Sequence, residues 1–192
     1  PPAPAPGRGS KFVRCAHGVT RRQIAAFTLM RRGARAVLAV LLCVWVGLAT
    51  AQTLVTPKPG ARDLCPVCGM LVSKYPNWVA TVLYQNGHAH HFDGAKDMFK
   101  YLADLPKYAP GHRREDIITV AVTDYYNLQK VDAKQAFYVI GSDVLGPMGH
   151  ELIPLATRTD AEDFLREHKG KKILRFDQVT RDLPARLDDG KF

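Results

Sequence analysis

The stretch WVATVLYQNGHAHHF, residues 78–92, predicts a β-hairpin. Trp78 to Gln85 is rich in β-branched and aromatic residues, which favour strands, and His88 to Phe92 returns as the second strand. Asn86-Gly87 between them is a strong hairpin signal, because these residues tolerate the positive φ that tight turns need. The two strands are therefore expected to be antiparallel neighbours in a sheet.

The residues after this hairpin complete a β-β-α-β order. We predict a helix over about 94–102, with Asp93 as its cap and with Met98 on the apolar face that enters the core. The run IITVAVTDY, Ile117–Tyr125, predicts a third strand.

The same order recurs downstream. AFYVI at 136–140 and ELIPLA at 151–156 predict strands, and KILRF at 172–176 predicts another. Between the last two, the capping box Thr159-Asp160-Ala161-Glu162 predicts a helix that ends near His168. We therefore predict an α+β fold with two repeated ββαβ modules, at about 71–127 and 136–180, packed as one domain over 65–180. The polar tail at 181–192 is expected to be loosely held.

Upstream of the hairpin, Cys65-Pro66-Val67-Cys68-Gly69-Met70 places three sulfur atoms within six residues, after a Pro/Gly-containing linker at 52–64. Thiolate and thioether ligands favour Cu(I) over harder ions. If the segment after Pro66 is extended, Cys68 and Met70 project to the same side. A structural disulfide, or a CxxC pair without metal, is equally open at this point.

Histidine and methionine supply further candidate ligands. In the second strand of the hairpin, His88 and His90 share one face and His91 lies on the other, so one site cannot use all three without a bulge. Met148 and His150 are a same-side pair in a Gly/Pro-rich loop of the second module. We predict that Met148, and secondarily His150, complete or cover a metal site. The alternatives are a surface role for the histidines and a packing role for Met148.

The positive charge belongs to the first part of the chain. The net charge is +9, and residues 1–51 hold eight of the 27 basic residues and no acidic one, which leaves +1 for residues 52–192. We therefore expect no nucleic-acid partner. No paired-carboxylate, Ser-His-Asp or glycine-rich phosphate pattern is convincing, and no enzymatic activity is predicted.

Residues 1–51 read as an upstream extension followed by an export signal. Met30 to Arg35 is a positive n-region, Ala36 to Leu48 is a short apolar run, and Ala49-Thr50-Ala51 fits a cleavage site. We expect cleavage and a periplasmic protein whose remaining cysteines are Cys65 and Cys68. Membrane association through a lipidated Cys43 is less favoured, because Val40-Leu41-Leu42 before it lacks small residues.

Three features of the sequence resemble the NosL family. They are the motif Cys65-Pro66-Val67-Cys68-Gly69-Met70, the strand pair ending in Phe92-Asp93, and the stretch Met148-Gly149-His150-Glu151-Leu152. The resemblance covers most of residues 62–180. It implies a copper-binding accessory protein for the assembly of nitrous oxide reductase, with two ββαβ modules and with Cu(I) bound by Cys68 and Met70. Its expected partner is a copper-receiving client enzyme or its assembly machinery.

Two alternative functions use the same cysteines. A thiol-disulfide redox protein would normally place its CxxC between a strand and a helix, whose N-terminus lowers the thiol pKa, and here a linker precedes the pair. A structural zinc module would use Cys65, Cys68 and two histidines, but zinc sites of this kind have four regularly spaced ligands, and Met70 would have no role.

Overall fold

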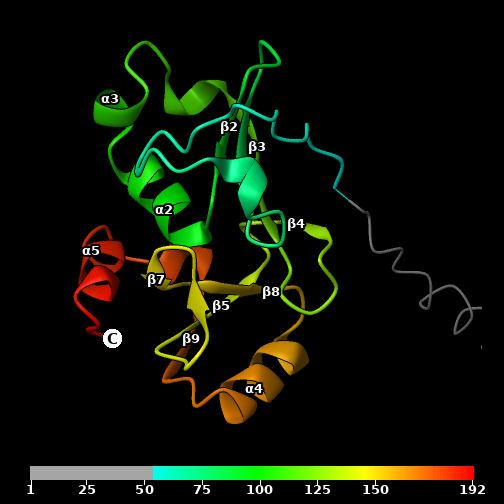
Figure 1. Cartoon of the computed structure of the whole chain (residues 1–192), viewed down its shortest axis with the longest axis vertical. Helices are drawn as coiled ribbons and strands as arrows, with labels where there is room; N and C mark the ends of the chain where they lie inside the picture. The colour runs from blue at the N-terminus through cyan, green and yellow to red at the C-terminus, as the bar shows by residue number, and fades with distance from the viewer. Residues whose placement is uncertain (1–53) are drawn as a thin grey trace, which may run out of the picture. The chain divides into compact units, whose positions relative to one another are not determined.

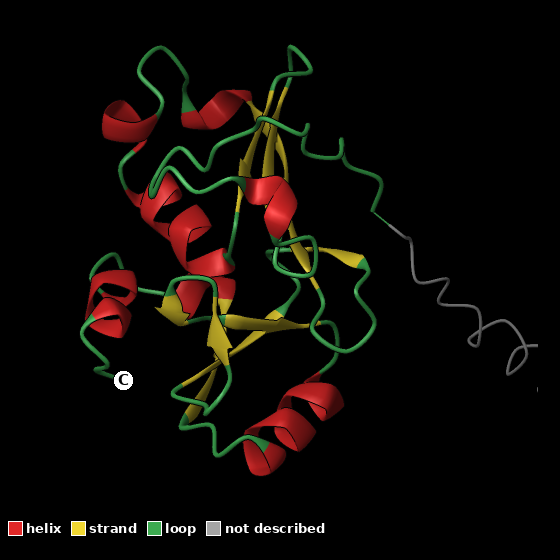
Figure 2. Cartoon of the chain, viewed as in Figure 1, coloured by secondary structure: helices red, strands yellow, loops and turns green. Residues whose placement is uncertain are grey.

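The computed structural model describes residues 54–192, which form an α+β fold. The predicted upstream extension and export signal at 1–51 lie outside the described residues. Figures 1 and 2 show two sheets, each with a helix against it. Among the helices of residues 54–192, none combines the length and apolar character needed to cross a membrane.

The first sheet is antiparallel, with the strand order β2-β1-β3-β4. Its strands are β1 (Ala80–Tyr84), β2 (Ala89–Phe92), β3 (Ile117–Thr123) and β4 (Lys130–Asp132). The predicted hairpin is confirmed, with Val82 of β1 opposite His90 of β2. Its loop has three residues, because Tyr84 pairs with His88, and Gly87 takes the positive φ of +81°. Strand β4 is missing from the sequence prediction, because three residues give no recognisable period.

Helix α2 (Ala95–Ala103) packs against β1 and β2 with a buried apolar face. Met98 is fully buried on this face, as predicted. The prediction that Asp93 caps the helix is wrong, because Gly94 is the N-cap and no side chain of the cap accepts a hydrogen bond. The short helix α3 (Leu105–Tyr108) follows.

The second sheet has the order β8-β5-β9 and is also antiparallel. Its strands are β5 (Phe137–Ile140), β8 (Ile153–Leu155) and β9 (Lys172–Arg175). Helix α4 (Arg158–Glu167) packs against it and begins two residues earlier than predicted. Thr157 is its cap, since its side-chain oxygen accepts the N–H of Asp160 at 3.1 Å, and the capping box predicted at Thr159 is wrong.

Both sheets place their first strand in the centre, with the second and third strands on either side of it. The second half contains an insertion, the hairpin β6 (Leu145–Gly146) and β7 (Gly149–His150) between β5 and β8. That the two halves are copies of one repeated module stays a prediction. Three short 3-10 helices complete the described chain: η1 (Val72–Lys74), η2 (Arg114–Asp116) and η3 (Phe176–Gln178).

The expectation of a loosely held tail at 181–192 is wrong. Residues Leu183–Asp188 form helix α5, and Leu183 and Leu187 are buried. The carboxylate of Asp188 pairs with Lys96 at 2.9 Å and with Lys100 at 2.7 Å, both on α2. Figure 1 shows α5 beside α2 and β7, where these contacts hold it.

Candidate metal site

The CPVCGM segment is a tight loop that is closed at its base. Leu64 and Leu71 form an antiparallel bridge, and the N–H of Cys65 donates to the carbonyl of Met70 at 2.8 Å. The N–H of Gly69 donates to the carbonyl of Cys65 at 2.9 Å, and Gly69 takes a φ of +76°, which favours glycine. The segment after Pro66 is therefore a turn, and the extended conformation considered from the sequence is wrong.

Two thiols and two carboxylates meet beneath this loop. The donor atoms of Cys65, Cys68, Asp93 and Asp97 all lie within 4.8 Å of one another. The thiol of Cys68 donates to Oδ1 of Asp93 at 3.2 Å, and that of Cys65 donates to Oδ2 of Asp97 at 3.4 Å. Asp93 follows β2 and Asp97 lies in the first turn of α2, so the junction of strand and helix presents both carboxylates to the loop.

Both cysteines are free thiols, and burial keeps them protonated. Burial raises the pKa of Cys65 from 9.0 to about 12, with a smaller contribution from the charges of Asp97 and Asp93. The pKa of Cys68 is raised as well, by burial first and then by its hydrogen bonds to the two carboxylates. A redox-active CxxC needs a lowered thiol pKa, so this environment disfavours the thiol-disulfide alternative.

Two buried carboxylate oxygens in this cluster have no hydrogen-bond partner among the described residues: Oδ2 of Asp93 and Oδ1 of Asp97. Oδ1 of Asp97 lies 3.3 Å from Nζ of Lys100, an ion pair without hydrogen-bond geometry. Unpaired buried carboxylate oxygens are costly, and a bound cation is one way to satisfy them. The cluster therefore fits a metal ion.

A cleft of about 510 Å³ opens over this cluster, and Cys68 lines it. Met148 from the β6–β7 hairpin lines the same cleft, with 41% of its surface exposed. The backbone carbonyl of Met148 accepts a hydrogen bond from the buried Nζ of Lys96 at 2.7 Å, which fixes the hairpin against α2. The structure thus brings Met148 to the same opening as Cys68.

The other candidate ligands have different surroundings. Met70 is partly buried in the CPVCGM loop, and it does not line the cleft. His150 packs edge-on against the ring of Phe192, with 4.9 Å between ring centroids. The structure does not place His150 in the cluster of thiols and carboxylates.

Glu151 joins the second half to the start of α2. Its Oε1 accepts the N–H of Lys96 at 2.6 Å and the N–H of Leu152 at 2.8 Å, so this side chain supplies the N-terminal cap that α2 otherwise lacks. A Cβ on Gly94 would lie 2.2 Å from Oε2 of Glu151, so a larger residue does not fit there. This contact holds the second half of the fold against the N-terminus of α2.

Sequence reasoning missed the two carboxylates. Asp93 and Asp97 are four residues apart across a helix start, a spacing that puts side chains on one side. That spacing was the available signal, but Asp93 lies 25 positions from Cys68, so the spacing does not identify the thiols as neighbours. The zinc alternative needed two histidines, and in residues 54–192 no histidine belongs to the thiol cluster.

Known proteins resemble this chain over most of its length. A family model described as NosL matches residues 57–184. The copper-binding lipoprotein NosL of Stutzerimonas stutzeri is 28% identical in an alignment of 169 residues, which covers 81% of this chain and 84% of the relative. The crystal structure of the copper chaperone NosL from Shewanella denitrificans matches with a TM-score of 0.56 and 25% identity, over 66% of this chain and 96% of that chain.

These names bear on two of the predictions. A copper-binding lipoprotein and a copper chaperone are not enzymes, which agrees with the prediction of no enzymatic activity. The word lipoprotein is at odds with the expectation that lipid anchoring is less favoured. Cys43, on which that expectation rests, lies outside the described residues.

Proposed function

Because this chain belongs to the NosL family, we propose that it is an exported Cu(I)-binding metallochaperone. Its relatives are named for copper, and the Cys68 thiol and the Met148 thioether at its cleft are ligands that favour Cu(I). In this proposal the copper ion is cargo, which the protein binds and passes on.

The observation that carries the proposal is the position of Cys68. Its thiol belongs to the buried cluster and also lines the cleft, so one side chain connects the protected donors with the solvent. Met148 lines the same cleft from the other half of the fold. In this proposal, the copper ion is held by Cys68, Met70 and Met148, with Cys65 beneath. Its coordination would remain open to a ligand from a partner protein.

The neighbouring carboxylates have a role in loading. Cysteine binds metal as thiolate, so the thiol proton must leave when copper arrives. Oδ1 of Asp93 already accepts the hydrogen bond of the Cys68 thiol and is therefore placed to receive that proton.

The proposed destination of the copper is the copper centre of nitrous oxide reductase, through the enzyme or its assembly machinery. This part rests on the resemblance of the CPVCGM and Met148–Leu152 motifs to the family. The proposed compartment is the periplasm, because residues 30–51 have the pattern of an export signal. The name of the S. stutzeri relative favours anchoring at the membrane by a lipidated cysteine, for which Cys43 is the candidate.

A titration of the reduced protein with Cu(I), against a competing chelator and with Zn(II) in parallel, tests the proposal. We expect tight 1:1 binding of Cu(I) and much weaker binding of Zn(II) at the thiol cluster, because most donors are sulfur. The carboxylates of Asp93 and Asp97 make zinc the specific competitor, since Zn(II) accepts both thiolate and carboxylate. Equal affinity for the two metals at this cluster, with the protein folding only when zinc is added, would replace the copper proposal with a structural zinc site.

A further inference from the structure

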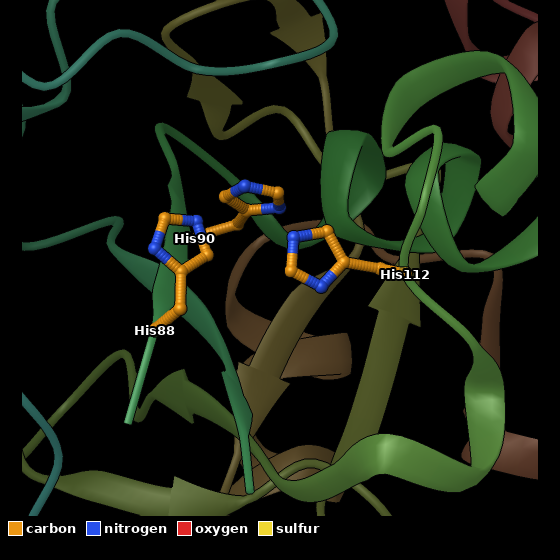
Figure 3. Close-up of side chains that lie close together, drawn as sticks. All are labelled: His88, His90 and His112. Atoms are coloured by element: carbon orange, nitrogen blue, oxygen red, sulfur yellow. The ribbon is translucent and has the colours of Figure 1, made fainter. Parts of the chain in front are cut away.

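A second group of metal-binding side chains lies outside the thiol cluster. His88, His90 and His112 each offer a ring nitrogen, and these three nitrogens lie within 4.8 Å of one another. Figure 3 shows the three rings gathered together, two from the β1–β2 hairpin and one from the loop after α3. The ring centroids of His88 and His90 are 4.6 Å apart, and His112 lies 5.4 Å from each of them.

A strand and a loop bring the three histidines together. His88 and His90 are two apart along the strand and share one face, while His91 points to the other face and contacts Thr81 at 3.0 Å. The loop that follows α3 turns at Gly111, with a φ of +92°, and delivers His112. The ring of His112 packs on Tyr84 at the end of β1, 4.3 Å between centroids.

His90 is oriented in the way that metal-binding histidines commonly are. Its Nδ1 is hydrogen-bonded to the hydroxyl of Tyr101, which in turn pairs with the hydroxyl of Tyr84 at 2.5 Å. This hydrogen bond holds the plane of the ring, and in the tautomer in which Nδ1–H donates to Tyr101, the lone pair of Nε2 is free for a metal. Tyr101 is fully buried, so this support is rigid.

The three rings are not engaged by acidic side chains. Among residues 54–192, no carboxylate is hydrogen-bonded to His88, His90 or His112. Their ring nitrogens are therefore available to a metal ion, for which imidazole is a common ligand. His88 is exposed and His112 is partly exposed, so an ion can reach the group from solvent.

We propose that His88, His90 and His112 form a second metal site, which binds one divalent transition-metal ion such as Zn(II) or Cu(II) through three imidazole nitrogens. Nitrogens around a tetrahedral zinc are about 3.4 Å apart, given Zn–N bonds of about 2.0–2.1 Å, so small side-chain rotations close the site. Three histidines leave a fourth position open to water or to a donor from another molecule. This site is independent of the proposed Cu(I) site, because it shares no ligand with the thiol cluster.

Zn(II) titration of the full chain, followed by NMR of the histidine ring nitrogens, tests the site. We expect one equivalent of Zn(II) to shift the ring signals of His88, His90 and His112, and to leave those of His168, which pairs with Asp143 elsewhere, unchanged. His112→Ala is expected to lower the affinity of this site at least about 100-fold, since groups that only support metal ligands contribute about 10–100-fold. His168→Ala is the matched control and should bind as the wild type does.

A second arm identifies the ligand atoms for Cu(II). The Cys65→Ser/Cys68→Ser double variant removes the thiols, which would reduce or bind Cu(II), and its fold is checked by circular dichroism. We expect its Cu(II) EPR spectrum to show couplings to imidazole nitrogen that are lost in His112→Ala. Any one of three results would overturn the proposal. Zinc could leave the three ring signals unshifted, His112→Ala could bind zinc with unchanged affinity, or the Cu(II) spectrum could lack these couplings.

Discussion

Cys65 and Cys68 are three residues apart, yet they have different surroundings. Cys65 is 2% exposed and packs in the main core, whereas Cys68 is partly exposed and lines the cleft. An incoming copper ion therefore reaches Cys68 first. We expect Cys65 to contribute to the folded structure as well as to the site, and Cys68 to contribute mainly to the site.

The alanine variants separate these two roles. Cys68→Ala and Met70→Ala should impair Cu(I) loading while the denaturation midpoint stays close to wild type. Cys65→Ala should impair loading and also cost about 1–2 kcal/mol of unfolding free energy, because it leaves a small cavity and an unpaired carboxylate at Asp97. Chelator competition and urea denaturation measure the two effects. A large stability loss in Cys68→Ala, equal to that of Cys65→Ala, would assign Cys68 a structural role instead.

The raised thiol pKa values predict how copper binding depends on pH. Both thiols are protonated in the free protein at neutral pH, because their pKa values lie above 9.0, and each thiolate that binds copper must release its proton. The apparent Cu(I) affinity should rise about tenfold per pH unit for each thiol proton displaced, between about pH 6 and pH 8. A slope near one indicates Cys68 alone, and a slope near two indicates both thiols. An affinity that does not change with pH over this range would exclude the thiols as ligands.

Helix α5 stabilises the element that carries the carboxylates. Asp188 pairs with the fully buried ammonium of Lys96, which also donates to the carbonyl of Met148. Removing the carboxylate leaves a buried charge with one partner fewer, so Asp188→Ala should cost about 1–3 kcal/mol of unfolding free energy. Asp182 lies at the start of the same helix, where its pair with Arg186 is exposed. Asp182→Ala should therefore cost much less unfolding free energy than Asp188→Ala. Equal losses in the two variants, measured by urea denaturation, would show that α5 is not held through Lys96.

Sequence patterns predicted the elements that are determined by residues close together in the chain. The β1–β2 hairpin and the apolar face of α2 are visible because their turn residues and periodicity lie within a few positions. The start of α4 was misplaced because Thr157 and Thr159 are both suitable caps, and neighbouring packing selects between them. Helix α5 was missed because its polar residues are paired with α2, a contact that no local pattern records.

The candidate site depends on contacts between distant parts of the chain. The sulfur motif was recognised from six adjacent residues, but Asp93 lies 25 positions from Cys68 and Met148 lies 52 positions from Lys96. Periodicity in a single sequence does not encode such pairs. The prediction that the second half contributes Met148 agrees with the shared cleft, although ligation by Met148 and His150 stays a prediction.

At the scale of the whole molecule, the fold places the CPVCGM loop on the first half and brings a hairpin of the second half to the same cleft. Glu151 and Lys96 lock the two halves at the start of α2, so the cleft between Cys68 and Met148 has rigid walls. In the proposed function, this arrangement protects the sulfur donors and leaves one side open for transfer of copper. If Met148 is a ligand, Met148→Leu should weaken Cu(I) binding, and Leu145→Ala on the same hairpin should not.

Copper K-edge X-ray absorption on the Cu(I)-loaded reduced protein tests whether copper binds to the sulfur donors of the cleft. We expect a coordination shell made mainly of sulfur, and one sulfur fewer in Met148→Leu. An unchanged sulfur shell in that variant would confine the site to the first half of the fold. A shell of nitrogen and oxygen alone in the wild type would contradict the assignment of copper to the CPVCGM loop.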